Sequence, residues 1–166
     1  MDEIERRVRD TVAGLTDVDV VDCDPALADT VAFCAAYGYD LDDSANAIVV
    51  VGKPSGAGAE PTYVACVVLA TASLDVNNVV RREMGVRKAS FARAEPTMEL
   101  TGMEIGGVTP FGLPSTMPIL VDSRVMEPDW IVLGGGNRSS KLRIAPQALD
   151  QIPSVRVIEG LAFVRG

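Results

Sequence analysis

Two apolar runs that lie close together constrain the fold more than any other part of the chain. Residues 44–51 read SANAIVVV and residues 62–70 read TYVACVVLA, and the β-branched side chains in both are typical of buried strands. The segment between them, KPSGAGAEP at 53–61, has the glycines and prolines of a flexible hairpin-like connection. We therefore expect two strands that pair in antiparallel fashion.

The rest of the chain alternates between helical and strand patterns. Helices or helical turns are expected at 2–15, from Asp24 to Gly38, from Ser73 or Asp75 to Met84, at 96–100 and at 146–151. Further strands are expected at 18–21, 86–91, 118–121, 130–133, 141–144 and 155–164. Interleaved helices and mostly antiparallel strands predict the α+β class, with one domain over residues 1–166.

Composition excludes several kinds of chemistry. The chain has no histidine, which rules out Ser-His-Asp and Cys-His catalysis and zinc sites built on histidine. Cys23, Cys34 and Cys66 have no CxxC spacing, so we expect reduced, mostly buried thiols. No apolar run is long enough for a membrane span, and the charged amino terminus is unlike a signal peptide, so a cytoplasmic protein is expected.

The net charge of −8, from 15 basic and 23 acidic side chains, works against nonspecific attraction to nucleic acid. A local basic patch on an acidic protein can still bind RNA.

The stretch Thr101–Gly112, TGMEIGGVTPFG, suits neither helix nor strand. Its glycines give backbone freedom, and Pro110 fixes φ and removes a donor. Such a loop can turn several N–H groups toward one point, as a developing oxyanion requires. A tight structural connection is the alternative. A second glycine-rich connection, GGGNRSS, occupies 134–140.

Several segments, taken in order, resemble the YbaK/EbsC-type (ProX-type) aminoacyl-tRNA editing domains. They are the SANAIVV strand, residues 74–80, GGVTPFG at 106–112, PILVD at 118–122 and GGGNRSSKLRIAP at 134–146. A lone GxxxP would mean little, but several ordered matches are far more specific. The resemblance covers the chain from about Asp24 onward, and implies a mixed, partly barrel-like sheet surrounded by helices.

In similar domains the GxxxP loop resembles a cradle for the aminoacyl ester at the 3′ end of tRNA, where a water attacks. The resemblance places four loop residues at the ester: Gly106, Gly107, Thr109 and Pro110. It implies that positioning and electrostatic stabilisation suffice, without a metal or cofactor. Substrate-binding residues are expected at Gly112, Gly134, Gly135, Gly136, Asn137, Arg138 and Lys141. Arg138 and Lys141 are the candidates for phosphate contact, and solvated surface charges are the alternative for both.

One departure from the family concerns its hallmark lysine, which precedes the first long apolar strand in a K-S/T-L/I context. The aligned residue here is Asn46, followed by Ala47 and Ile48. Asparagine offers amide donors and an acceptor but no charge. Asn46 is therefore either a catalytic or substrate-reading residue, or a hydrogen-bonded polar group at the end of a strand.

The resemblance implies a trans-editing deacylase that removes a mischarged amino acid from tRNA. Its expected partners are the acceptor end of aminoacyl-tRNA and, as a second candidate, an aminoacyl-tRNA synthetase; neither DNA nor a membrane is expected. One alternative is a non-catalytic module that retains the pocket for an aminoacyl or nucleotide-like ligand. The other is an interaction domain that docks on a synthetase.

Overall fold

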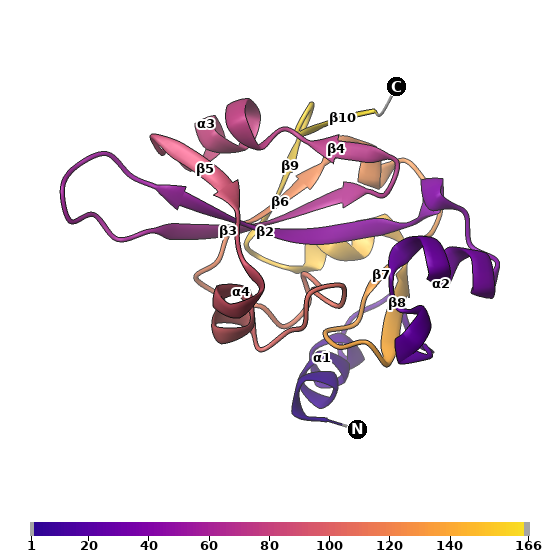
Figure 1. Ribbon diagram of the computed structural model, residues 1–166. Coiled ribbons are helices and arrows are strands. Elements are labelled where there is room, and N and C mark those ends of the chain that lie inside the picture. Colours follow the sequence, from indigo (N-terminus) through magenta and orange to yellow (C-terminus); the bar gives the residue numbers. More distant parts are fainter. Residues whose placement is uncertain (1, 165–166) are drawn as a thin grey trace.

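A five-stranded sheet runs through the middle of the molecule, in the order β5-β2-β3-β6-β9 (Figure 1). The expected hairpin is confirmed: β2 (Ala45–Lys53) and β3 (Thr62–Leu69) pair in antiparallel fashion, with Ala45 opposite Leu69 and Gly52 opposite Thr62. On the far side of β3, β6 (Ile119–Asp122) and then β9 (Val155–Ile158) continue the sheet in parallel. On the near side β5 (Lys88–Phe91) pairs with only the second half of β2.

Two smaller antiparallel sheets flank the central one. The first has the order β1-β8-β7, from Val18–Asp22, Ser140–Ile144 and Ile131–Gly134. The second pairs β4 (Ala72–Leu74) with β10 (Ala162–Val164). Within residues 2–164, the part of the chain that this computed structural model describes, every sheet is open. The α+β class with mostly antiparallel pairing is confirmed, and the curvature expected of the sheet does not close a barrel.

The helices of the described chain are short. They are α1 (Glu3–Ala13), α2 (Thr30–Tyr37), α3 (Arg81–Met84) and α4 (Ala94–Thr101), with 3-10 turns at Pro25–Leu27, Leu41–Asp43, Ser123–Met126 and Pro146–Gln151 and a π turn at Val76–Val80. Among residues 2–164 every helix is too short or too polar to cross a lipid bilayer.

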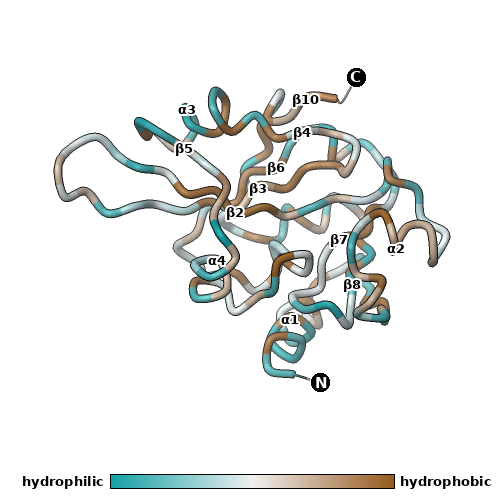
Figure 2. The backbone as a smooth tube through the Cα atoms, viewed as in Figure 1, coloured by the Kyte–Doolittle hydropathy of each residue, from teal (hydrophilic) through white to brown (hydrophobic). Residues whose placement is uncertain are grey.

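Side chains that alternate along the central strands divide the core between the two faces of the sheet. Val49 and Val67 face α1 and the glycine loops, whereas Val50 and Cys66 face the side that carries the π turn and α3. Apolar colour follows β2 and β3 through the middle of the molecule and fades toward the tip of their hairpin (Figure 2). The three cysteines are buried and free, as expected.

Two elements differ from expectation. The helix expected from Asp24 is divided: Asp24 caps only a 3-10 turn, and α2 begins after a second cap position at Asp29. Of the two starts expected for the next helix, Ser73 or Asp75, the second is confirmed: Asp75 caps the π turn by accepting from Asn78 N, while Ser73 lies in β4. Residues 155–164 form two strands in different sheets, since the left-handed Gly160 (φ 75°) turns the chain between them.

Asp122 joins β10 to the central sheet. Its buried carboxylate accepts a hydrogen bond from Ala162 N at 3.3 Å, and the Arg124 guanidinium donates to Ala162 O at 2.8 Å. Oδ2 has no hydrogen-bond partner among the described residues and lies 4.0 Å from Arg124 Nη1. Burial raises the pKa of this carboxyl above its ordinary value of 3.8, against the opposing effect of the Ala162 contact. Asp122 therefore has a structural role, which is to fix β10 against the end of β6.

Replacement of Asp122 tests which property of the carboxylate holds β10. Asp122→Ala leaves the buried Ala162 N–H unpaired, so we expect the free energy of unfolding in urea to fall by about 1–3 kcal/mol. Asp122→Asn keeps an oxygen acceptor and removes a poorly compensated charge, so its loss is expected to be much smaller. Equal losses for the two variants would mean that the charge, and not the acceptor, is what matters.

Candidate functional site

The two glycine-rich loops meet backbone to backbone. Gly136 N donates to Gly107 O at 2.6 Å, and Glu104 N donates to Gly136 O at 3.3 Å. A Cβ added at Gly107 would lie 2.5 Å from Asn137 O, and one added at Gly134 would lie 2.4 Å from Val108 O. No side chain fits at either position, so the approach of the loops requires glycine.

The amino-terminal helix holds both loops in place. Asn137 is buried, and its Nδ2 donates to Asp2 Oδ2 at 2.9 Å and to Glu5 Oε2 at 3.2 Å. Asn137 Oδ1 accepts from Ser139 N at 2.9 Å, which fixes the turn of its own loop. Arg7 donates to the carbonyl of Thr101, where the first loop begins. Asp2 also caps α1 by accepting from Glu5 N, and this bond, followed by the Asn137 contact, lowers the pKa of its carboxyl.

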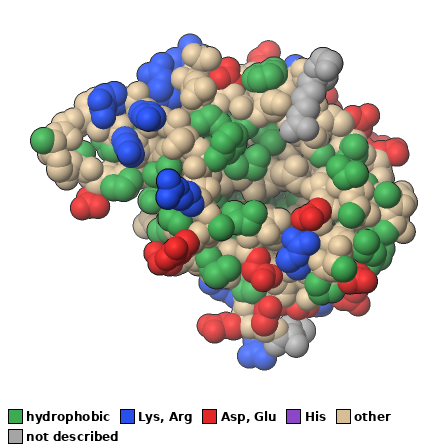
Figure 3. Space-filling view, in the orientation of Figure 1, with side chains coloured by type: hydrophobic (Ala, Val, Ile, Leu, Met, Phe, Trp, Pro, Cys, Tyr) green, Lys and Arg blue, Asp and Glu red, His purple; other side chains and the backbone are tan. Residues whose placement is uncertain are grey.

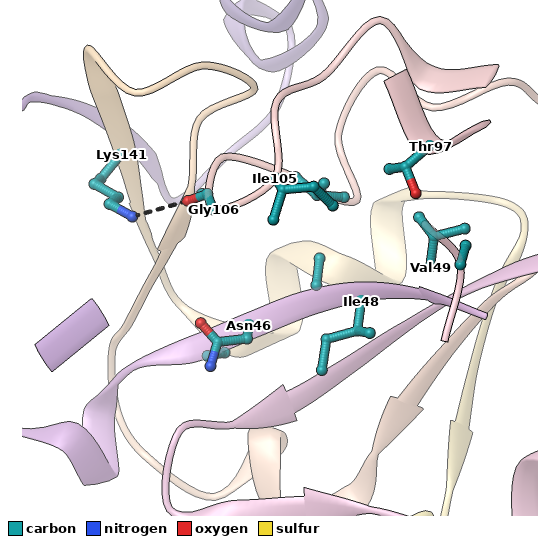
Figure 4. A pocket seen from close by; sticks show the side chains of 12 residues that line it. Asn46, Ile48, Val49, Thr97, Ile105, Gly106 and Lys141 are labelled. Atoms are coloured by element: carbon teal, nitrogen blue, oxygen red, sulfur yellow. Dashed lines mark hydrogen bonds between the residues drawn. The ribbon is translucent and has the colours of Figure 1, made fainter. Parts of the chain in front are cut away.

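Beside these loops lies a cavity of about 230 Å³ (Figure 4). Strand β2 forms one wall, and the first glycine loop with α4 and the ends of β7 and β8 forms the other. The lining residues are Ala45, Asn46, Ala47, Ile48, Val49, Ala92, Thr97, Ile105, Gly106, Val108, Gly134 and Lys141. The lining is mostly apolar with a few polar groups, a combination typical of small-molecule sites.

The β2 wall presents an open strand edge. Strand β5 pairs with β2 only from Val50 onward. One more backbone hydrogen bond, from Ala92 N to Val49 O at 2.9 Å, lies just outside the paired residues. Backbone groups of alternate residues in an antiparallel strand point to the same side, so those of Ala47 point to the side that β5 has left. Among residues 2–164 no strand pairs with that edge between Ala45 and Val49, so main-chain donors and acceptors are available beside the cavity.

The first loop brings further main-chain donors. Gly106 and Val108 both line the cavity, and neither N–H group has an acceptor among the described residues. The intervening Gly107 N–H is already used, since it donates to Glu104 O at 2.8 Å. An anionic or carbonyl oxygen in the cavity could be bound by such unpaired N–H groups.

Asn46 is half-buried on β2, and its Oδ1 accepts from Thr30 Oγ1 at 2.8 Å. No described residue accepts from its Nδ2, so the amide keeps donors for a ligand. Thr30 is the first residue of α2. This helix therefore orients the asparagine at the cavity wall.

Lys141 reaches the same cavity from β8 and is only 6% exposed. Its Nζ donates to Ala28 O at 2.6 Å and to Gly106 O at 3.4 Å, the latter drawn in Figure 4, and lies 5.5 Å from the centre of the Phe33 ring. Burial lowers the pKa of this amine below its ordinary value of 10.5. Of the described residues that line the cavity, it alone has a charged side chain.

The structure brings four of the residues singled out in the sequence into one cavity: Asn46, Gly106, Gly134 and Lys141. Others lie behind this wall: Gly107, Thr109, Gly135, Gly136 and Asn137 are buried and pack against neighbouring backbone or α1. Pro110 and Gly112 line a different cavity of about 300 Å³, next to Thr11 and Gln151. Arg138 forms an ion pair with Asp29 at 3.1 Å and donates to Pro25 O.

Sequence reasoning did not single out several further residues of the cavity, three of them apolar. Ile48, Ala92, Thr97 and Ile105 line it from β2, from the end of β5, from α4 and from the loop. Ile105 offered the one available signal, because it is an apolar residue within a glycine-rich loop and is 52% exposed. The other three look like ordinary helix or strand residues.

The contact between the loops can be tested with a matched pair of glycine substitutions. Gly134→Ala places a methyl group 2.4 Å from Val108 O, so we expect the free energy of unfolding to fall by about 1–3 kcal/mol. Gly14→Ala is the control, because nothing lies within 4 Å of its added Cβ and its φ is negative. Urea unfolding should separate the two, and equal stability would contradict the close approach.

Lys141 provides a test by pH. Its folded pKa is lowered, so between that value and 10.5 the unfolded chain binds more protons than the folded chain. Stability must therefore rise with pH in this window, by up to about 1.4 kcal/mol per pH unit. We expect the unfolding free energy of the wild type to gain on that of Lys141→Met as the pH approaches 10.5. Parallel curves for the two proteins would show that folding does not lower the pKa of this amine.

Comparison with known proteins identifies the family of the chain and structures that share its fold. The model of the "Aminoacyl-tRNA editing domain" family matches residues 24–152. A solved structure described as a putative trans-editing enzyme for prolyl-tRNA synthetase superposes with a TM-score of 0.81 at 22% identity, covering 100% of this chain and 99% of the other. A structure solved as a hypothetical protein gives 0.79 at 23% identity, covering 94% and 99%. A scaffold protein from a study of epitope grafting gives 0.80 at 19% identity, covering both chains fully. At such identities these structures share the fold, and the family model shows that the chain belongs to the aminoacyl-tRNA editing domain family.

Proposed function

We propose that residues 1–166 act as one editing domain, which hydrolyses the ester of a mischarged aminoacyl-tRNA in trans. The observation that carries this proposal is the cavity in which Asn46, Gly106 and Lys141 converge, in a chain of the editing family. A cavity of about 230 Å³ suits an aminoacyl group better than a whole nucleotide. The free thiols fit a reducing compartment, so the proposed setting is the cytoplasm.

In this proposal the main chain binds the aminoacyl group. The unpaired N–H groups of Gly106 and Val108 hold the ester carbonyl oxygen, and the open edge of β2 at Ala47 meets the polar groups of the amino acid. Apolar neighbours such as Ile48 and Ile105 contact its side chain. Stabilisation of the oxyanion by main-chain N–H groups requires no titratable side chain, so it is possible in a chain without histidine.

The reaction is hydrolysis of one C–O bond. A water oxygen attacks the carbonyl carbon, the bond to the ribose oxygen breaks, and that oxygen takes the proton released by the water. The products are the free amino acid and a tRNA with both terminal hydroxyls. An aminoacyl ester is already activated, so positioning and stabilisation of the oxyanion supply most of the rate enhancement.

Asn46 and Lys141 divide a role that a single lysine has in similar domains. Asn46 Nδ2 donates to the substrate while Thr30 fixes the amide from behind. Lys141 supplies positive charge from β8, next to Gly106, and stabilises the developing oxyanion. In this proposal the positive charge that similar domains have at the position of Asn46 on β2 is supplied by Lys141 from the opposite wall of the cavity.

A non-catalytic binding module is the second candidate. The observation in its favour is that the Gly107 N–H and the Asn46 Oδ1 are already satisfied within the protein. Such a module would bind an aminoacylated end in the same cavity and release it unchanged.

Asn46 variants separate the two candidates. With a panel of mischarged tRNAs we expect wild-type protein to release free amino acid from at least one. Asn46→Ala removes one neutral hydrogen bond, so kcat/KM should fall by about 3–10-fold. Asn46→Lys should also lower it, since lysine has no acceptor for Thr30. Asn77→Ala, an exposed asparagine outside the cavity lining, is the control and should match wild type.

Two results would count against this arrangement. No release from any substrate by the wild type, together with release by Asn46→Lys, would indicate a binding module that has lost a family lysine. Full activity in both Asn46 variants would mean that β2 is only scaffold at this position.

A further inference from the structure

Basic side chains gather on one side of this acidic protein. Residues 81–93 contain five lysines and arginines and only one of the 23 acidic residues, Glu83. The strand register adds Lys53, which lies directly opposite Lys88 where β2 and β5 pair. In Figure 3 blue side chains cluster over β5, α3 and the base of the long hairpin, whereas red ones occupy the lower and right-hand rim. We call this cluster the β5 patch: Lys53, Arg81, Arg82, Arg87, Lys88 and Arg93.

Core packing places the patch. A Cβ added at Gly52 would lie 2.6 Å from Met84 Cε, so glycine lets α3 pack directly on β2. Arg81 and Arg82 project from this helix and donate through Nε to the carbonyls of the preceding turn, at 2.9 and 3.3 Å. Those bonds leave most guanidinium donors free for an external acceptor.

The β5 patch lacks internal counter-charges. The ion pairs between described residues involve Arg9, Arg124, Arg138 and Arg156, so no member of the patch has an acidic partner within 4.0 Å in that part of the chain. Like charges directly opposite each other on neighbouring strands destabilise a sheet, as Lys53 and Lys88 must. A polyanionic ligand would relieve this repulsion.

The patch also leads to the cavity. β5 begins at Lys88 within the patch, and the chain just beyond its end lines the cavity at Ala92. Four residues of strand span about 13 Å, a distance that a few nucleotides of single strand cover. At the cavity end Phe91 is 57% exposed, which gives an aromatic surface for a base to stack on.

The basic residues beside the glycine loops are less available. Arg138 is paired with Asp29, Lys141 is buried, and Arg143 lies over the Trp130 ring at 4.6 Å. Backbone phosphates bind exposed lysines and arginines that can release counterions. The β5 patch offers five exposed groups and the half-buried Arg81, gathered around one edge strand.

We propose that the β5 patch binds the sugar-phosphate backbone of the tRNA acceptor arm, and that the single-stranded 3′ end runs along β5 past Phe91 into the cavity. This inference rests on the proposed function, because it takes the cavity as the site of the ester. RNA is favoured over other polyanions because the cations flank the edge strand β5, which carries the exposed ring of Phe91 and ends beside that site.

Charge reversal at Lys53 and Lys88 tests the patch through binding of unacylated tRNA between 50 and 200 mM salt. Lys53→Glu/Lys88→Glu should weaken binding at least tenfold at 100 mM salt and reduce the slope of log K against log salt by about 2. The control Arg6→Glu/Arg143→Glu makes the same change of charge on α1 and β8 and should bind like wild type. Equal weakening in the two double variants, or unchanged affinity and slope in the first, overturns the proposal.

A single variant separates binding from folding. Lys53→Glu alone creates an opposite-charge pair with Lys88, so the protein should melt at a higher temperature and yet bind tRNA more weakly. Weaker binding together with a lower melting temperature would assign the effect to folding and overturn the proposal. Binding of phosphatidylserine vesicles in place of tRNA would overturn it as well.

A short ester distinguishes failure of the patch from failure of the proposed function. Aminoacyl-adenosine has no backbone phosphates, so the Lys53→Glu/Lys88→Glu variant should hydrolyse it at the wild-type rate while its KM for aminoacyl-tRNA rises. An unchanged KM for aminoacyl-tRNA overturns the patch. If the wild type hydrolyses neither ester, the proposed function fails, and selective loss of tRNA binding in the variant still supports the patch.

Discussion

The close approach of two glycine loops is the constraint on which the candidate site depends. Gly107 and Gly134 bring main chain against main chain at distances that no Cβ would allow. Because the loops are held together, Gly106 and Val108 form one wall of a cavity whose other wall is the open edge of β2. Helix α1 reinforces the contact through Asp2, Glu5 and Asn137, although α1 precedes the part of the chain that the family model matches. The supporting structure of the site is therefore larger than the matched region.

Charge is distributed in a way that the net value of −8 conceals. One cation, Lys141, is buried at the cavity with a lowered pKa and backbone carbonyls as acceptors. Six others, five of them exposed, form the β5 patch without acidic partners among the described residues. A buried charge close to the ester and an exposed patch for the backbone would act on different parts of one substrate. The acidic remainder of the surface would favour the patch as the point of contact.

Local patterns in the sequence were sufficient for much of the fold. The β2–β3 hairpin follows from two β-branched runs around a flexible segment, and α1 follows from the helical spacing of Val8 and Val12. Prediction failed where tertiary pairing overrode local preference. Residues 155–164 divide into two strands because Gly160 redirects the chain into another sheet, where β10 pairs with β4.

The sequence by itself excluded every mechanism that depends on histidine, and it indicated that two glycine loops would be important. Only the tertiary structure decided which residues share a cavity. Asn46 and Lys141 are 95 positions apart, and β2 and β8 belong to different sheets. Pro110 and Gly112, although close to Gly106 in sequence, face a second cavity. Strand register likewise set Lys53 opposite Lys88. Side-chain convergence depends on register and on the packing of sheets, and neither is encoded in the spacing of residues along one segment.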